Sequence, residues 1–90
     1  MNKKELIEGL EKLRDHKIKV EDFSPIEREL PLECKRIFDS SEIPYEDTAQ
    51  LVIYVLQGKV EVKVSERMYE EGYMYFGRIE ALFVHVRVHK

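Results

Sequence analysis

Cysteine, tryptophan and long apolar runs are almost or wholly missing from this chain of 90 residues. The single cysteine, Cys34, excludes a disulfide within the chain, so the fold does not depend on an oxidising compartment and we expect a cytoplasmic protein. A membrane-spanning helix requires about 20 consecutive apolar residues. The sequence contains no such run, and residues 1–12 lack the apolar stretch of a secretory signal. We therefore expect no membrane segment and no leader.

Amides are equally scarce, with one asparagine and two glutamines, whereas charged residues make up 37% of the chain. A typical domain carries about 25% charged residues. Many lysines and glutamates with few thermolabile amides are typical of thermophilic proteins. Small viral proteins share this composition, so we expect a thermophilic or viral origin.

The sequence also lacks the motifs that would indicate chemistry. No dense basic stripe accompanies the net charge of −3, so the usual footprint of a nucleic-acid-binding domain is missing. His85 and His89 would lie about 13 Å apart on one strand, at roughly 3.3 Å per residue, which is too far for one zinc ion. Cys34 falls in an apolar helical stripe, where a buried and unreactive thiol is expected. We therefore predict no metal site, no cofactor and no catalytic residues.

An amphipathic helix is predicted for residues 2–15. Asn2 can cap it, and Glu5 follows three residues later, as in a capping box. Its leucines recur at helical spacing and form one apolar stripe. We expect this stripe to cover the sheet.

A second helical segment begins at Ser24, because serine caps a helix and the following Pro25 fits its first turn. Pro31 interrupts the pattern, since proline lacks a backbone donor and clashes with the preceding turn. We predict a short helical turn at 25–29 and a helix at 31–39.

Residues 51–64 predict a β-hairpin around Gln57 and Gly58. A two-residue turn with glycine second is favourable, because glycine reaches positive φ at little cost. In this register Val55 faces Val60, Ile53 faces Val62 and Leu51 faces Val64. All six side chains then share one face.

The alternative is a helix over 45–57, with Glu46 and Asp47 in its first turn and Gly58 at its end. The apolar run that ends at Gln57 shows no clean helical period and is rich in strand-preferring residues. We therefore favour the strand.

Glu71 and Gly72 predict a second tight turn. With it, Val64 faces Ile79, Val62 faces Ala81 and Val60 faces Phe83, so a third strand continues the apolar face. Gly77 within that strand suggests a bulge. Residues 85–89 then extend past their partner as an unpaired edge, with valines on one side and His85, Arg87 and His89 on the other.

These patterns together predict an α+β fold in a single domain of residues 1–90. Two N-terminal helical segments (2–39) would pack on one face of a three- to four-stranded antiparallel β-meander (50–89). Residues 40–49 would form the linker between the two parts.

The functional hypothesis is a small soluble, non-enzymatic interaction or regulatory protein. The unpaired edge and the Tyr/Met-rich strand predict a homodimer, because an open strand edge pairs readily with another chain. The predicted partner-binding residues are Val84, Val86, Val88, Tyr73, Tyr75 and Met74.

Two alternatives remain. Aromatic side chains on a sheet can stack unpaired bases, which would make the chain a single-stranded nucleic-acid-binding module using Tyr69, Tyr75, Phe76, Arg67, Arg78 and Arg87. A small ribonuclease-like enzyme would use Arg87 with His85 or His89. The interleaved glutamates would repel phosphate and disfavour both.

Overall fold

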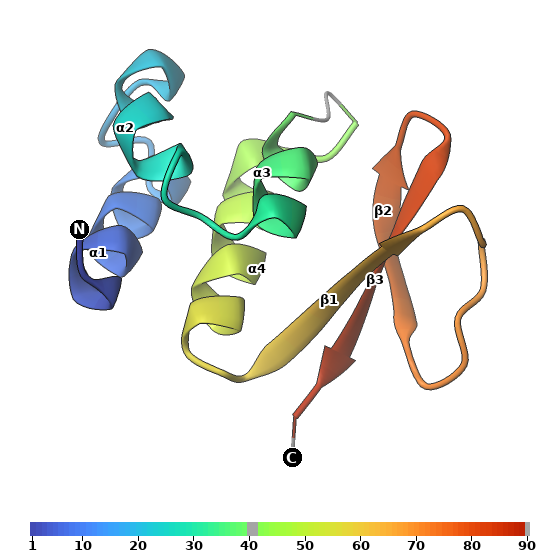
Figure 1. Cartoon of the computed structure of the whole chain (residues 1–90). Helices are drawn as coiled ribbons and strands as arrows, with labels where there is room; N and C mark the ends of the chain where they lie inside the picture. Colours follow the sequence, from blue (N-terminus) through green and yellow to red (C-terminus); the bar gives the residue numbers. More distant parts are fainter. Residues whose placement is uncertain (40–41, 90) are drawn as a thin grey trace.

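The computed structural model describes residues 1–39 and 42–89, which form an α+β fold with helices packed on an antiparallel sheet (Figure 1). The helical elements are α1 (Lys3–Arg14), the 3₁₀ helix η1 (Val20–Phe23), α2 (Ser24–Glu27), α3 (Leu32–Phe38) and α4 (Tyr45–Leu56). The strands are β1 (Val60–Ser65), β2 (Met74–Ile79) and β3 (Leu82–Val88). The predicted fold class and the three antiparallel strands are confirmed, but the predicted strand boundaries and strand order are not.

The N-terminal helices follow the predicted boundaries. The Asn2 side chain accepts a hydrogen bond of 2.8 Å from the Glu5 backbone N–H and so caps α1. Pro31 separates α2 from α3, as expected. Cys34 is buried in the helical core, and this burial raises the pKa of its thiol to about 11. At that pKa the thiol stays protonated and unreactive near neutral pH.

The leucine stripe of α1 does not cover the sheet. Leu10 and Leu13 pack in one core cluster with Val52 and Ile53 of α4. The helices α1 and α4 therefore form a layer of their own, and α4 separates α1 from the sheet (Figure 1).

The predicted strand at 51–57 is wrong, because these residues belong to α4. Val52 and Ile53 face the helical core, whereas Leu51 faces a second core beneath the sheet. A helix buried on two sides shows no single apolar stripe, which explains the missing helical period. The predicted linker at 40–49 is wrong from Tyr45 onward for the same reason; Ser40 and Ser41 lie outside the described residues.

Gly58 ends α4 instead of forming a hairpin turn. Its φ is +74°, and its N–H donates to the Val55 carbonyl at 3.1 Å. The Lys59 N–H donates to the Tyr54 carbonyl at 2.9 Å. This pair of bonds is the Schellman motif, in which glycine takes the left-handed position after the helix.

The sheet order is β1-β3-β2, so the predicted meander order and its registers are wrong. Val60 pairs with Val88 and Val64 pairs with Val84, both on β3. Strand β3 also pairs with β2 through a turn at residues 80–81, where Glu80 has φ +52°. The predicted unpaired edge at 85–89 is therefore wrong through Val88, because these residues form the central strand.

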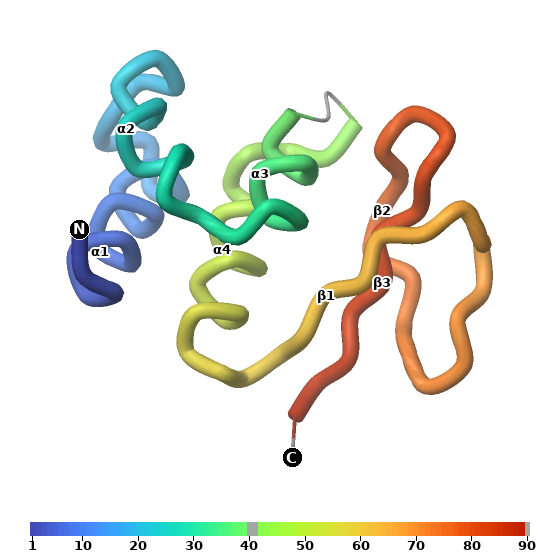
Figure 2. Tube along the Cα trace, in the orientation of Figure 1, coloured from blue at the N-terminus to red at the C-terminus, as the bar shows by residue number. Residues whose placement is uncertain are grey.

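The connection at residues 66–73 carries the chain from one sheet edge to the other (Figure 2). Gly72, with φ +83°, lies within it and not at a tight hairpin. The predicted bulge in β2 is confirmed, since the register shifts between Tyr75 and Gly77. The predicted alternation of β3 is also confirmed, because Val84 and Val86 share a core with the β1 valines.

Replacing Gly58 by alanine tests whether this residue caps the C-terminus of α4. An L-residue in the left-handed region costs about 1–2 kcal/mol, so Gly58→Ala should lower the free energy of unfolding by about that amount. Urea denaturation followed by circular dichroism measures it. The neighbouring Gln57→Ala, at an ordinary φ of −82°, is the control and should change stability little. Equal stability of wild type and Gly58→Ala would contradict the assignment.

Candidate functional site

An open groove lies between α4 and the sheet face that α4 covers. Its walls are largely apolar and its volume is about 320 Å³. We call it the base groove; it is lined by Leu51 and Tyr54 of α4, Val60 of β1, Phe76 of β2 and Val86 and Val88 of β3, with Asp47 and Gln50 as its polar members.

The strand register explains why the groove is apolar. Directly opposed residues of neighbouring strands point to the same face. Met74 opposes Val86, and Val88 opposes Val60, so all four lie on the helix-covered face. The inserted residue of the bulge, Phe76, packs against the same core.

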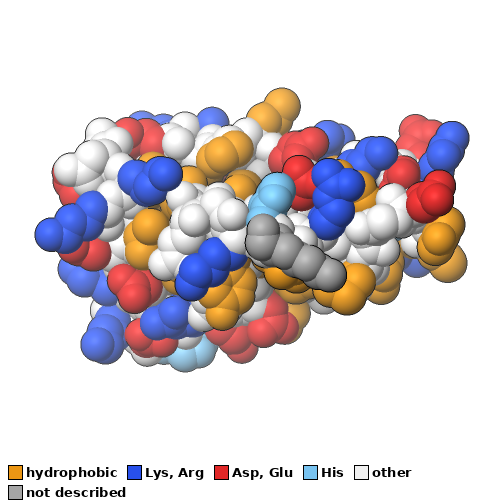
Figure 3. Space-filling model, turned by 90° about the horizontal axis from the view of Figure 1, so that it is seen from below, with side chains coloured by type: hydrophobic (Ala, Val, Ile, Leu, Met, Phe, Trp, Pro, Cys, Tyr) orange, Lys and Arg blue, Asp and Glu red, His pale blue; other side chains and the backbone are white. Residues whose placement is uncertain are grey.

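The groove is open because the helices cover only part of this face. Helices α3 and α4 contact β1, the strand nearest to them. Met74 remains 59% exposed, Val88 55% and Tyr54 39%. Figure 3, which looks at this end of the molecule, shows hydrophobic side chains at the surface where the helical half meets the sheet. These exposed apolar side chains make the groove the candidate binding site.

Opposite charges lie near the two ends of the groove. Asp47 stands in the first turn of α4, where a carboxylate is favourable toward the helix N-terminus. Beyond the other end of α4, Lys59 Nζ lies 5.4 Å from the centre of the Tyr54 ring. Between them, the Gln50 side-chain Oε1 accepts a hydrogen bond of 2.9 Å from the Arg14 guanidinium.

The opposite face of the sheet is polar and is partly covered by the strap, by which we mean residues 66–73. Within the strap, Glu70 accepts hydrogen bonds from Ser65 Oγ at 3.0 Å and Lys63 Nζ at 3.2 Å. The Tyr73 hydroxyl donates to Glu61 at 3.2 Å. These bonds hold the strap against β1 on the side away from the helices.

His85 lies on this polar face and is only 1% exposed. Its Nε2 lies 2.8 Å from the Arg67 carbonyl of the strap, and its ring packs edge-on toward Tyr75. Arg87, two residues on, pairs with Glu61 and stacks over the Tyr73 ring at 4.8 Å. His89 Nε2 stands 3.8 Å from Glu61.

The structure divides the predicted partner-binding residues among three places. Val84 and Val86 are core residues of the central strand, so they cannot form the predicted edge contact. Val86 and Val88 also line the base groove, and Met74 lies opposite Val86 on the same face of the sheet. Tyr73 and Tyr75 lie on the polar face, where they contact the side chains described above.

The predicted nucleic-acid-binding residues do not share one surface. Tyr75 lies beside Phe83 on the polar face, whereas Phe76 points to the opposite, apolar face. Tyr69 of the strap is 76% exposed, and Arg67 of the strap is also exposed.

The arginines are engaged nearby. Arg87 pairs with Glu61, and Arg78 Nε donates to the Glu80 carbonyl at 2.6 Å. A phosphate chain would have to compete with these contacts.

The ribonuclease hypothesis placed His85 or His89 beside Arg87. His85 is shielded by the strap, while His89 and Arg87 share the single carboxylate of Glu61. Within residues 1–39 and 42–89, no three histidine, cysteine or acidic side chains come together as metal ligands. No helix in this part of the chain is long and apolar enough to cross a membrane.

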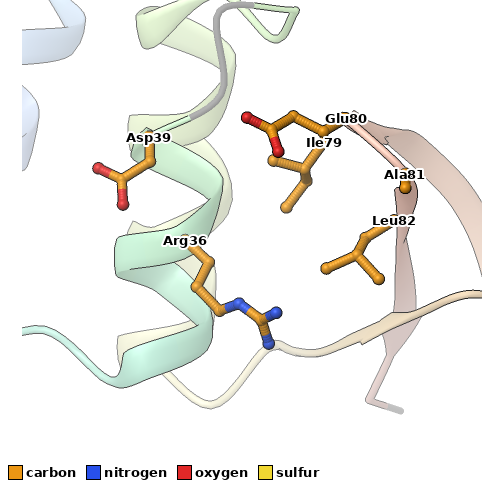
Figure 4. A pocket seen from close by; sticks show the side chains of 6 residues that line it. All are labelled: Arg36, Asp39, Ile79, Glu80, Ala81 and Leu82. Atoms are coloured by element: carbon orange, nitrogen blue, oxygen red, sulfur yellow. The ribbon is translucent and has the colours of Figure 1, made fainter.

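A second hollow, of about 290 Å³, lies between α3 and the β2–β3 turn. Figure 4 shows Ile79 and Leu82 pointing into the gap, Arg36 extending from α3 at the end of the gap away from the turn, and Asp39 pointing away from the gap. Arg36, Asp39 and Glu80 are all exposed to solvent. The hollow lacks buried polar groups that would hold a ligand, so the base groove is the stronger candidate.

Comparisons of the chain with protein-family models, curated proteins and solved structures found no match. The candidate site therefore rests on geometry. Val86 and Val88, two of the residues predicted to bind a partner, line the groove, whereas the sequence analysis did not name Tyr54, Leu51 or Val60 as site residues. The available signal was the helical spacing of residues 47, 50, 51 and 54, which share one face only if this segment is a helix.

The pH dependence of stability tests whether ionised Glu70 holds the strap against β1. Hydrogen bonds from Ser65 and Lys63 lower the pKa of Glu70 below its ordinary 4.5. Glu70 therefore stabilises the fold above that pH, and the contribution is lost as the pH falls through its lowered pKa. Glu70→Gln should melt below wild type at pH 7, and the gap should shrink toward pH 3.

The matched control is Glu71→Gln, whose carboxylate forms no hydrogen bond or ion pair with the described residues. It should melt like wild type at both pH values. An undiminished gap for Glu70→Gln at pH 3 would show that the ionised Glu70 does not hold the strap.

Proposed function

We propose that this chain is a non-enzymatic interaction or regulatory protein that binds a polypeptide partner in the base groove. The observation that carries the proposal is the uncovered apolar face around Met74, Val88 and Tyr54, which a domain of 90 residues leaves in contact with solvent. Removing apolar surface from water is favourable by about 25 cal/mol per Å². Binding of a partner that covers this face is therefore stabilised by the burial.

The shape and chemistry of the groove support a polypeptide ligand. Its α4 wall follows residues 47, 50, 51 and 54, which span about 10 Å at 1.5 Å per residue. Apolar grooves of this kind bind the apolar side chains of a helix or an extended segment. The polar members, Asp47 and Gln50, favour a partner with a basic or hydrogen-bonding group beside its apolar residues.

The contacts of the polar face support a binding role over catalysis. General acid–base work needs a proton donor and acceptor with room for a substrate between them. Glu61, Arg87 and Tyr73 instead satisfy one another across neighbouring strands. Such cross-strand pairs stabilise a sheet, which gives these residues a structural role.

A peptide library tests the proposed function. Random peptides of about 16 residues, selected on the immobilised protein, should yield apolar sequences that bind in the groove. Val88→Glu should weaken their binding at least about tenfold, because a carboxylate in an apolar site loses its water. Val20→Glu is the control, since Val20 is 43% exposed on η1, away from the groove. Failure to select any peptide on monomeric protein, or equal binding by the two variants, would overturn the proposal.

A further inference from the structure

We propose that the polypeptide in the base groove is a second copy of this chain, related by a two-fold axis that sets the two α4 helices antiparallel. This inference rests on the proposed function, since it names the partner of the same groove. It differs from the dimer predicted from sequence, because the central strand β3 offers no edge and α4 becomes the interface element.

The charges at the two ends of the groove favour an antiparallel second copy. Asp47 marks the N-terminal end of the α4 wall, and Lys59 follows the C-terminal end, beside Tyr54. A two-fold axis perpendicular to α4 places one end of each groove opposite the other end of the groove on the second copy. Asp47 of each copy then approaches Lys59 of the other, so both contacts join opposite charges.

Helix direction favours the same arrangement. Each α4 has a partial positive charge at its N-terminus and a partial negative charge at its C-terminus. Antiparallel packing sets unlike ends side by side, whereas parallel packing would bring Asp47 to Asp47 and Lys59 to Lys59. The charge pattern therefore selects one orientation of the second copy.

The apolar surface of the groove is suited to contact with a second copy of itself. Each copy supplies a hollow, lined by Phe76 and Val86, and exposed apolar side chains on its border, Met74 and Val88. A self-complementary contact buries both features of both copies at once. A second copy therefore already carries the apolar side chains and the basic group that the groove requires.

Sedimentation of paired charge variants tests the inference. Wild type should sediment at twice the monomer mass of 10.8 kDa. Asp47→Lys should face Lys59 of its mate, and Lys59→Glu should face Asp47. Each variant alone should raise the dimer dissociation constant at least about tenfold, because like charges then meet twice across the axis.

An equimolar mixture of the two variants is the decisive arm. In the mixed pair, each contact again joins opposite charges, so a 1:1 heterodimer should form with near wild-type affinity. Recovery on mixing also shows that both variants are folded. The matched controls are Glu21→Lys and Lys19→Glu, exposed charges at the start of η1, which should leave the dimer unchanged.

Three outcomes separate the inference from the function beneath it. A monomeric wild type that still binds selected peptides in the groove would overturn the second copy and leave the proposed function standing. A dimer that persists in both single variants would place the interface on another surface and overturn the inference. A monomer that binds no peptide would remove both.

Discussion

Burial of α4 on two sides is the constraint on which the rest of this structure depends. Val52 and Ile53 pack against the N-terminal helices, while Leu51 packs against the sheet. Each such side chain contributes roughly 2 kcal/mol when it leaves water, and domains of this kind have about 5–15 kcal/mol of net stability. Loss of α4 would therefore separate the helical layer from the sheet and leave neither with a complete core.

The groove follows from the widths of the elements. A helix with its side chains is about 10 Å wide, and neighbouring strands lie about 4.8 Å apart. Because α3 and α4 lie against β1, an edge strand, they do not reach the whole of β2. Ile43 packs against Gly77 of β2, whereas Met74 at the start of β2 is 59% exposed. The proposed partner site is the part of this sheet face that the helices leave uncovered.

The sequence predicts elements with one buried face far better than elements with two. The helix at 2–15 is marked by the Asn2 cap and one apolar stripe, and the helix at 31–39 by Pro31 and its apolar spacing. By contrast, α4 has no side-chain N-cap and no single apolar stripe. The sequence predicted a positive φ at Gly58 in a hairpin turn. Gly58 does have a positive φ, but it ends a helix. The true sheet reversal contains Glu80 at φ +52°, where no glycine marks it. Strand order and the groove depend on that reversal, so local patterns could not supply them.

Methyl-to-methyl nuclear Overhauser effects offer the most direct measurement of the central claim, that α4 is a helix shared by two cores. The structure predicts cross-peaks from the Ile53 methyls to Leu10 and Leu13, and from the Leu51 methyls to Val84 or Val86. Cross-peaks from Ile53 to Val62, with none to Leu10 or Leu13, would restore the hairpin. They would contradict the layer arrangement, the base groove and the dimer together.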